Sequence, residues 1–321
     1  MTAGILIVTC LMAMTLKHRL TRQLSLSDVV IPFIFLTLFQ YEQFALTQNP
    51  SHGPLPGMIV QAVALAMLIP RAWVRGLVMA LLCFLGVYTG FGFFLGILVP
   101  AFITLDLVKH WRSPSDRIAL TVSLVFALAG TASFFVGYKH QPAIDCYKFP
   151  HDRPVEYIAF ASVLFGRAVG AMQAFAHDGV VRIGASITAY GLLLLTALVA
   201  AVKVMRRRDQ PADRVILFLA AFPIIYGLSA AVGRVCAGLA SALSSRYVAY
   251  SLSGYLAMYL AAVTWIKDSR SSKWHRWRAV GLGLAVGLMV FKEVLITHDA
   301  PDFEKLAAGK REWIQCYLET G

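Results

Sequence analysis

Long apolar runs separated by short basic connections dominate this chain of 321 residues. Several runs reach the roughly 20 residues that an α-helix needs to cross the hydrocarbon core of a bilayer. The short alternating segments of an outer-membrane barrel are absent from the sequence. The pattern therefore predicts an all-α, polytopic transmembrane helical bundle with about ten spans. We expect these spans at about residues 2–16, 27–46, 55–70, 76–89, 93–108, 118–137, 180–202, 215–236, 247–266 and 279–297.

One further stretch, 156–178, is apolar enough to span but carries Arg167 in its middle. If it crosses, the run Arg206-Arg207-Arg208 falls on the side opposite the earlier basic connections. If it is re-entrant or lies in the interface, every basic connection falls on one side. We prefer the second reading, because irregular spans are tolerated where protein covers them.

We treat residues 1–297 as one transmembrane domain, with residues 298–321 as an external tail. The tail contains an amphipathic stretch, which favours a location on the membrane surface. A solvated tail is the alternative.

Composition and charge are typical of a membrane protein, and they predict how the chain is oriented in the membrane. Charged residues make up 14% of the chain, against about 25% in soluble domains. The net charge of +12 does not indicate nucleic acid, because most lysines and arginines occupy short connections between apolar runs. That is the positive-inside pattern. We therefore predict an integral membrane protein with both termini external.

The five cysteines suggest one possible disulfide. Cys10, Cys83 and Cys236 fall inside or at the end of predicted helices, where we expect them to be inert. Cys146 and Cys316 are both predicted to be external, where disulfides persist. A Cys146–Cys316 bridge is one hypothesis, and two thiols too far apart to bond is the other. No CxxC or histidine-rich spacing indicates a metal, and we expect no cofactor.

Charged residues inside apolar runs are the strongest candidates for a site. In the predicted topology Arg167, Arg234, Lys292, Glu293 and Glu42 all lie in the external half of the bilayer or at its edge. Converging cations there would suit a diphosphate, and arginine donates two parallel hydrogen bonds to phosphate. Glu42 or Glu293 could then act as a general base on an acceptor hydroxyl. The alternatives are structural Lys292–Glu42 or Arg234–Glu293 ion pairs, or a lysine that reaches the interface.

Two arginines flank one tight connection made largely of Ala, Gly and Ser. Arg234 ends one apolar run, and Arg246 begins the next, followed by Tyr247. A guanidinium near lipid needs a partner, so we assign substrate binding to these three residues together with Arg167 and Lys292.

A glycine-rich segment, Tyr88-Thr89-Gly90-Phe91-Gly92, is predicted to form a tight external turn between two helices. Its backbone could approach a ligand. We favour turn geometry and close packing of small residues.

Four short motifs carry a resemblance that spans most of residues 26–262. They are Gly233-Arg234 with Leu243-Ser244-Ser245-Arg246-Tyr247, Gln40-Tyr41-Glu42-Gln43-Phe44, Gly90-Phe91-Gly92 and Phe135-Val136-Gly137-Tyr138. With them the chain resembles a largely uncharacterised group of bacterial inner-membrane proteins. That group looks distantly like envelope glycosyltransferases of the GT-C type and polysaccharide polymerases. The resemblance implies a polyprenyl-diphosphate-linked sugar substrate on the external face.

The chain departs from the GT-C pattern in one respect. Those enzymes place a catalytic acid in an external loop just after the first helix. Here the segment after the first predicted helix lies inside, and its only acid is Asp28. Either catalysis uses other residues, as a metal-independent transferase or polymerase could, or this protein has lost it.

Two other functions remain open. The protein could be a non-catalytic subunit that docks envelope components through the tail and the loop 138–155, since loops carry function disproportionately. It could also be a transporter, which we rank third because no inverted repeat is evident. The expected partners are membrane lipid, the lipid-linked glycan and, for the second function, other protein subunits.

Overall fold

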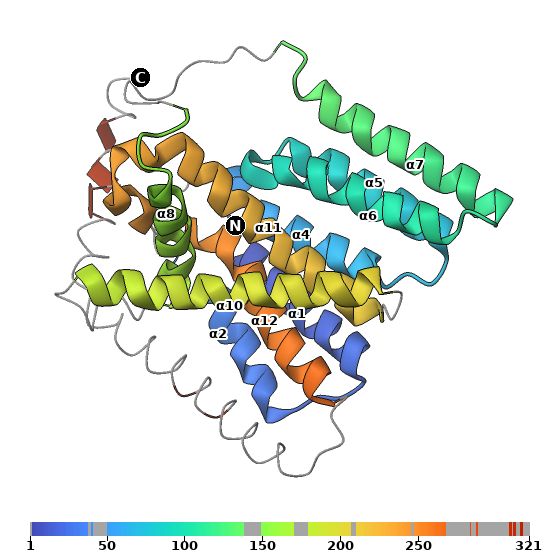
Figure 1. The fold of residues 1–321 in the computed structure, drawn as a ribbon, viewed down its shortest axis with the longest axis horizontal. Helices are drawn as coiled ribbons and strands as arrows, with labels where there is room; N and C mark the ends of the chain where they lie inside the picture. The colour runs from blue at the N-terminus through green and yellow to red at the C-terminus, as the bar shows by residue number, and fades with distance from the viewer. Residues whose placement is uncertain are drawn as a thin grey trace.

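The computed structural model describes residues 2–37, 40, 50–137, 149–169, 179–206, 210–244 and 247–267, together with 283, 287, 308–309, 311–312 and 315–316. Every regular element among these residues is helical, and no strand occurs in them. The all-α class predicted from the sequence is therefore confirmed (Figure 1).

The chain forms long helices joined by short 3₁₀ segments. The α-helices are α1 Thr2–Thr21, α2 Val30–Phe35, α4 Pro54–Ala66, α5 Ala72–Val87, α6 Leu95–Lys109, α7 Pro114–Ser133, α8 Val155–Gly166, α10 Gly179–Met205, α11 Pro211–Arg234 and α12 Val248–Lys267. The 3₁₀ segments are η1 Leu26–Val29, η3 Pro50–His52, η4 Gly90–Phe94, η5 Arg167–Val169, η6 Val235–Ala237 and η7 Leu239–Leu243. Proline begins α4, α7 and α11, where its missing N–H has no intrahelical partner to lose.

Five helical stretches are long and apolar enough to cross a bilayer: Thr2–Thr21, Gly90–Lys109, Pro114–Ser133, Ile183–Met205 and Pro211–Ala237. Their outward faces are apolar as well. Exposed side chains on α7 and α10 include Ile118, Val122, Val125, Ile187, Leu192, Leu195 and Leu198. Soluble proteins rarely expose apolar surface on this scale. These features indicate a membrane protein, whereas a bundle of about ten spans stays a prediction.

The predicted spans between residues 2 and 266 each overlap a described helix, but their ends differ. The first helix was expected to end at residue 16 and instead continues to Thr21. It continues because the ammonium group of Lys17 is neutralised inside the protein by Asp28. The span predicted at 279–297 and most of the tail 298–321 lie outside the described residues.

The stretch predicted to be re-entrant or interfacial contains α8 and η5. At 1.5 Å per residue, the 12 residues of α8 extend about 18 Å, well short of the roughly 30 Å hydrocarbon core. Gly166 at the end of α8 packs against Ser186, close to the start of α10. Figure 1 shows α8 lying across the direction of α10. The rest of the stretch, residues 170–178, lies outside the described residues, so its re-entrant path stays a prediction.

The bundle packs around α11, which contacts α8, α10 and α12. A second group consists of α5, α6 and α7, with α7 at the outer edge in Figure 1. The helix α4 connects the two groups through its contacts with α1, α5 and α12. Close approach is possible where small residues meet, as at Gly227 of α11 against Ala161 of α8.

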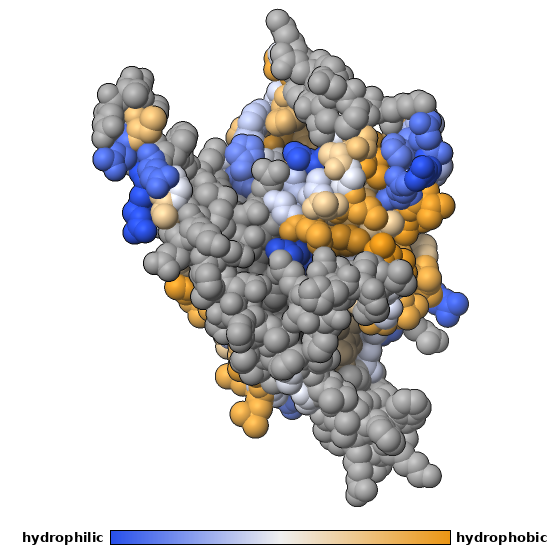
Figure 2. Space-filling view, turned by 90° about the vertical axis from the view of Figure 1, so that its left-hand side faces the viewer, coloured by the Kyte–Doolittle hydropathy of each residue, from blue (hydrophilic) through white to orange (hydrophobic). Residues whose placement is uncertain are grey.

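The bundle has two distinct ends. At the one that we call the basic end, α1, α6, α10 and α12 finish, while α5 and α11 begin. At the other, which we call the aromatic end, η4 lies beside the finish of α11 and the start of α12. Figure 2 views the molecule from the side where α10 begins, and there hydrophilic residues lie among apolar ones.

Candidate functional site

The basic end contains an aspartate held by two arginines. Asp106 of α6 is buried and accepts a hydrogen bond from Arg75 Nε of α5 at 2.6 Å. Its other carboxylate oxygen pairs with Arg214 of α11. Arg75 also donates to the Ile69 carbonyl at 2.6 Å. One carboxylate therefore joins three helices where their ends meet.

A second buried aspartate joins α1, η1 and α12. Lys17 Nζ lies 2.6 Å from Asp28 Oδ1, and both side chains are almost fully buried. The Tyr259 hydroxyl donates to the same carboxylate at 2.7 Å. Burial by itself raises the pKa of Asp28, but hydrogen bonds from Lys17, the Ser25 backbone N–H and Tyr259 outweigh it. The pKa of Asp28, which lies outside the five candidate spans, is therefore below its ordinary value.

A third buried aspartate, Asp213, lies in the first turn of α11. It accepts a hydrogen bond from the Trp265 indole N–H of α12 at 2.9 Å and pairs with Lys203 Nζ of α10 at 3.5 Å. The Lys203 ammonium also lies 4.7 Å from the Trp265 ring centroid, in a cation–π contact. All three aspartates therefore neutralise cations where helix ends meet.

The aromatic end is organised by rings instead of carboxylates. The aromatic cluster consists of Phe91, Phe94, Tyr226, Tyr247 and Tyr250. The Phe91 centroid lies 4.9 Å from that of Tyr226 and 5.0 Å from that of Tyr250, both edge to face. The Tyr250 hydroxyl donates to the His52 carbonyl, which attaches η3 to the start of α12.

Three predicted site residues lie at this end. Arg234, the last residue of α11, is half-buried, and its guanidinium carbon lies 5.5 Å from the Tyr247 ring centroid. Tyr247 is buried in the aromatic cluster. Arg167 is buried at the end of α8, which packs against both η6 and η7 of the α11–α12 connection. The structure thus brings Arg167, Arg234 and Tyr247 to the same end.

The remaining predicted site residues lie outside the described part of the chain. These are Glu42, Arg246, Lys292 and Glu293. Their assignments as general base or as substrate-binding groups stay predictions. The ion pairs Lys292–Glu42 and Arg234–Glu293, given above as alternatives, involve these residues and stay predictions too.

The predicted Cys146–Cys316 bridge is wrong. Cys316 is an exposed thiol, whereas Cys236 of η6 is disulfide-bonded. Cys146 itself lies outside the described residues. We expected Cys236 to be inert because it sits at the end of an apolar run, but the 3₁₀ turn after Arg234 takes it out of the helix.

The glycine-rich turn is packed, as the favoured interpretation expected. Gly90 has φ +44°, a conformation that glycine adopts without strain. A Cβ added at Gly92 would overlap the Gly86 carbonyl and the Thr89 hydroxyl. The turn therefore requires glycine for packing, and it directs the Phe91 ring into the aromatic cluster.

Two buried polar side chains, Gln61 and Ser253, were not predicted as site residues. Gln61 of α4 is fully buried, and neither of its amide atoms has a hydrogen-bond partner among the described residues. Gly57 approaches Ala249 of α12, and Gln61 and Ser253 each follow that contact by one helical turn. The buried Ser253 hydroxyl also has no partner within the described chain.

Comparison with known proteins finds no matching family model, no matching curated protein and no matching solved structure. The resemblance to envelope glycosyltransferases and polymerases therefore rests on the short motifs alone. Within the described residues, no group of three His, Cys, Asp or Glu side chains is arranged to hold a metal ion.

Proposed function

We propose that this integral membrane protein acts in cell-envelope glycan assembly and binds a lipid-linked diphosphate at its aromatic end. The observation that carries the proposal is Arg234. Its guanidinium lies over Tyr247 at the end of an apolar helix and has no carboxylate partner among the described residues. A charge in such a position is costly without a ligand or partner, which favours an anionic ligand.

The proposed chemistry assigns each cation and acid a separate task. Arg234 and Arg246 hold the diphosphate, and Arg167 and Lys292 add positive charge. Tyr247 fixes the Arg234 guanidinium by stacking. Glu42 or Glu293 accepts the proton of an acceptor hydroxyl, whose oxygen attacks the anomeric carbon while the lipid diphosphate leaves. This is a metal-independent transfer or polymerisation.

The proposed location is the bacterial inner membrane, with the aromatic end external. Lysines and arginines concentrate at the opposite end, which supports this orientation. The disulfide at Cys236 supports it too, because disulfides persist outside the cytoplasm. Since α1 ends at the basic end, an external N-terminus follows, and an external C-terminus is part of the same proposal.

The test is native mass spectrometry of the gently purified full chain, combined with lipid extraction. We expect the wild type to retain a polyprenyl-diphosphate species. Arg234→Gln should retain about tenfold less, because it loses charge-assisted hydrogen bonds to phosphate. Arg153→Gln is the matched control, since that arginine is 79% exposed and, among the described residues, its side chain pairs with Glu156 alone.

Two results would contradict the proposal. One is equal lipid retention in the wild type and Arg234→Gln. The other is stoichiometric protein chains that copurify with no polyprenyl-diphosphate lipid, which would support the non-catalytic subunit instead.

A further inference from the structure

We infer that the basic end carries a separate binding site for a phosphate-bearing anion, formed by Arg19 and Arg22 over the α4–α5 connection. The site lies at the opposite end of the bundle from Arg234 and does not depend on the function proposed above. The shared chemistry of its ligand is a phosphate group, either in the head group of an anionic phospholipid or in a soluble anion.

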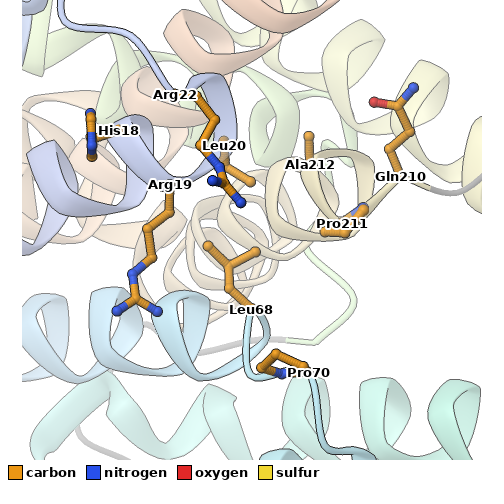
Figure 3. Close-up of a pocket in the computed structure, with 9 residues that line it drawn as sticks. All are labelled: His18, Arg19, Leu20, Arg22, Leu68, Pro70, Gln210, Pro211 and Ala212. Carbon is orange, nitrogen blue, oxygen red and sulfur yellow. The ribbon is translucent and has the colours of Figure 1, made fainter.

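The site is a pocket of ≈ 540 Å³ between helix ends. Its lining residues are His18, Arg19, Leu20, Arg22, Leu68, Pro70, Gln210, Pro211 and Ala212. Figure 3 shows the Arg19 and Arg22 guanidinium groups on the α1 side, extended toward Leu68 and Pro70, with Pro211 and Ala212 across from them. Its volume lies within the roughly 300–1,000 Å³ of small-molecule sites.

The two arginines differ from the cations at this end that pair with a buried aspartate. Lys17, Arg75 and Lys203 each pair with a buried aspartate. Within the described chain, the Arg19 and Arg22 side chains have no hydrogen bond or ion pair, and no acid lines the pocket. Their positive charge is therefore available to a ligand.

Arg22 is also held in a conformation that its residue type disfavours. Its φ is +57°, and among the described non-glycine residues only Arg22 has a positive φ. Glycine is the usual residue at such a helix end, because a Cβ is strained in the left-handed region. The Arg22 backbone N–H donates to the His18 carbonyl at 2.8 Å, which closes the end of α1. An arginine where glycine fits better points to a role for its side chain.

The neighbouring Lys17 network fixes this turn in place. Lys17 Nζ donates to the Gln23 carbonyl at 2.7 Å, and the Thr21 hydroxyl donates to the Lys17 carbonyl at 3.0 Å. Residues on both sides of Arg22 are thus bonded to Lys17, whose ammonium group is paired with the buried Asp28. The backbone that carries Arg22 is therefore fixed before a ligand binds, which lowers the entropy cost of ordering this turn.

The surroundings favour phosphate over other anions. Arginine binds phosphate with two parallel hydrogen bonds, and two arginines can share the oxygens of one group. The α11 N-terminus at Pro211 and Ala212 adds its partial positive charge. Leu20, Leu68 and Pro70 supply apolar contacts for a glycerol or acyl group. Basic pockets at the ends of membrane helices suit anionic head groups.

The experiment measures thermal unfolding of the full chain in a neutral detergent, with native mass spectrometry on the same samples. The probes are phosphatidylglycerol, phosphatidylcholine, and inorganic phosphate against sodium chloride of equal ionic strength. We expect phosphatidylglycerol or phosphate to raise the unfolding temperature by a few degrees and phosphatidylcholine to leave it unchanged. A shift with phosphatidylglycerol alone identifies a lipid head group, and a shift with phosphate identifies a soluble anion.

Three variants separate the pocket from general surface charge. Arg19→Gln/Arg22→Gln should reduce binding of the active probe at least tenfold. Arg206→Gln removes one exposed cation at the same end without touching the pocket, so its binding should stay within twofold of wild type. Arg22→Gly should also weaken binding, while its ligand-free unfolding temperature should not fall below that of wild type, because glycine relieves the strain.

Either of two outcomes would overturn the inference. One is that neither phosphatidylglycerol nor phosphate binds the wild type more strongly than its control. The other is that Arg206→Gln weakens binding as much as the Arg19→Gln/Arg22→Gln pair. An Arg22→Gly variant whose ligand-free unfolding temperature matches wild type shows that its loss of binding does not come from unfolding.

Discussion

The two ends of the helical bundle hold their cations in different ways. At the basic end, Asp28, Asp106 and Asp213 neutralise lysines and arginines from neighbouring helices. At the aromatic end, Arg234 rests on the Tyr247 ring, and packed rings join the helices. One end is thus joined by ion pairs and the other by aromatic contacts.

The difference separates cations that stabilise the fold from cations that can bind a ligand. A cation paired with a buried carboxylate is already satisfied, and removal of its partner is costly. A cation over a ring, or one with no partner, keeps its hydrogen-bond donors available. Arg234 at one end and Arg19 and Arg22 at the other belong to this second class.

The largest effect should come from removal of the central carboxylate at the basic end. Asp106→Asn leaves Arg75 and Arg214 without their shared counter-charge and should destabilise the protein by about 3–5 kcal/mol. Unfolding in detergent measures the loss. Asp116→Asn is the control, because Asp116 is only half-buried and makes no ion pair in the described chain. Equal stability of the two variants would show that the ion pairs do not join this end.

An intermediate effect is expected at the aromatic end, where packing replaces charge. Gly92→Ala places a methyl group against the Gly86 carbonyl and should cost about 1–3 kcal/mol, because the turn that carries Phe91 must shift. Gly191→Ala is the control, since that position in α10 has open space around it. The control should be neutral or stabilised by up to about 1 kcal/mol. A harmless Gly92→Ala would mean that this end is loosely packed.

The smallest expected effect is a loss of stability at acidic pH, caused by protonation of Asp28. The pKa of Asp28 is lower in the folded protein than its ordinary value, so the folded state favours the ionised carboxylate. That stabilisation is complete above the unfolded-state pKa of about 3.9 and is lost as pH falls through the folded-state pKa. The difference in stability between wild type and Asp28→Asn should therefore be constant from pH 6 to 8 and shrink in acid. Unfolding midpoints of wild type and Asp28→Asn, measured from pH 8 down to pH 3, give this difference in stability. A difference that stays constant down to pH 3 would refute the role of Asp28.

Much of the fold could be predicted because apolar runs are local. Each predicted span between residues 2 and 266 overlaps a helix, and the packed Gly90–Gly92 turn follows from its glycines. The predicted end of α1 was wrong because Lys17 was treated as a solvated residue. Its partner Asp28 is 11 residues away, beyond the helix end, and no local pattern indicates that they pair.

Some residues of the candidate sites could likewise be predicted from the sequence, and others could not. Embedded arginines were identifiable from their apolar neighbours, so Arg167 and Arg234 were predicted as site residues. The pocket at Arg19 and Arg22 was not predicted, because both residues were counted as ordinary basic connection residues. Its walls come from α1, the α4–α5 connection and the start of α11. The strain at Arg22 is a backbone property that the sequence does not display.

The sequence alone determined that the chain forms apolar helices and that its basic residues cluster between them, because both follow from neighbours along the chain. Only the tertiary structure decided which acid meets which base. Asp106 pairs with residues 31 and 108 positions away, and Asp213 bonds to a tryptophan 52 positions away. Such pairs form where helix ends pack, since burial makes a charge without a partner too costly to keep.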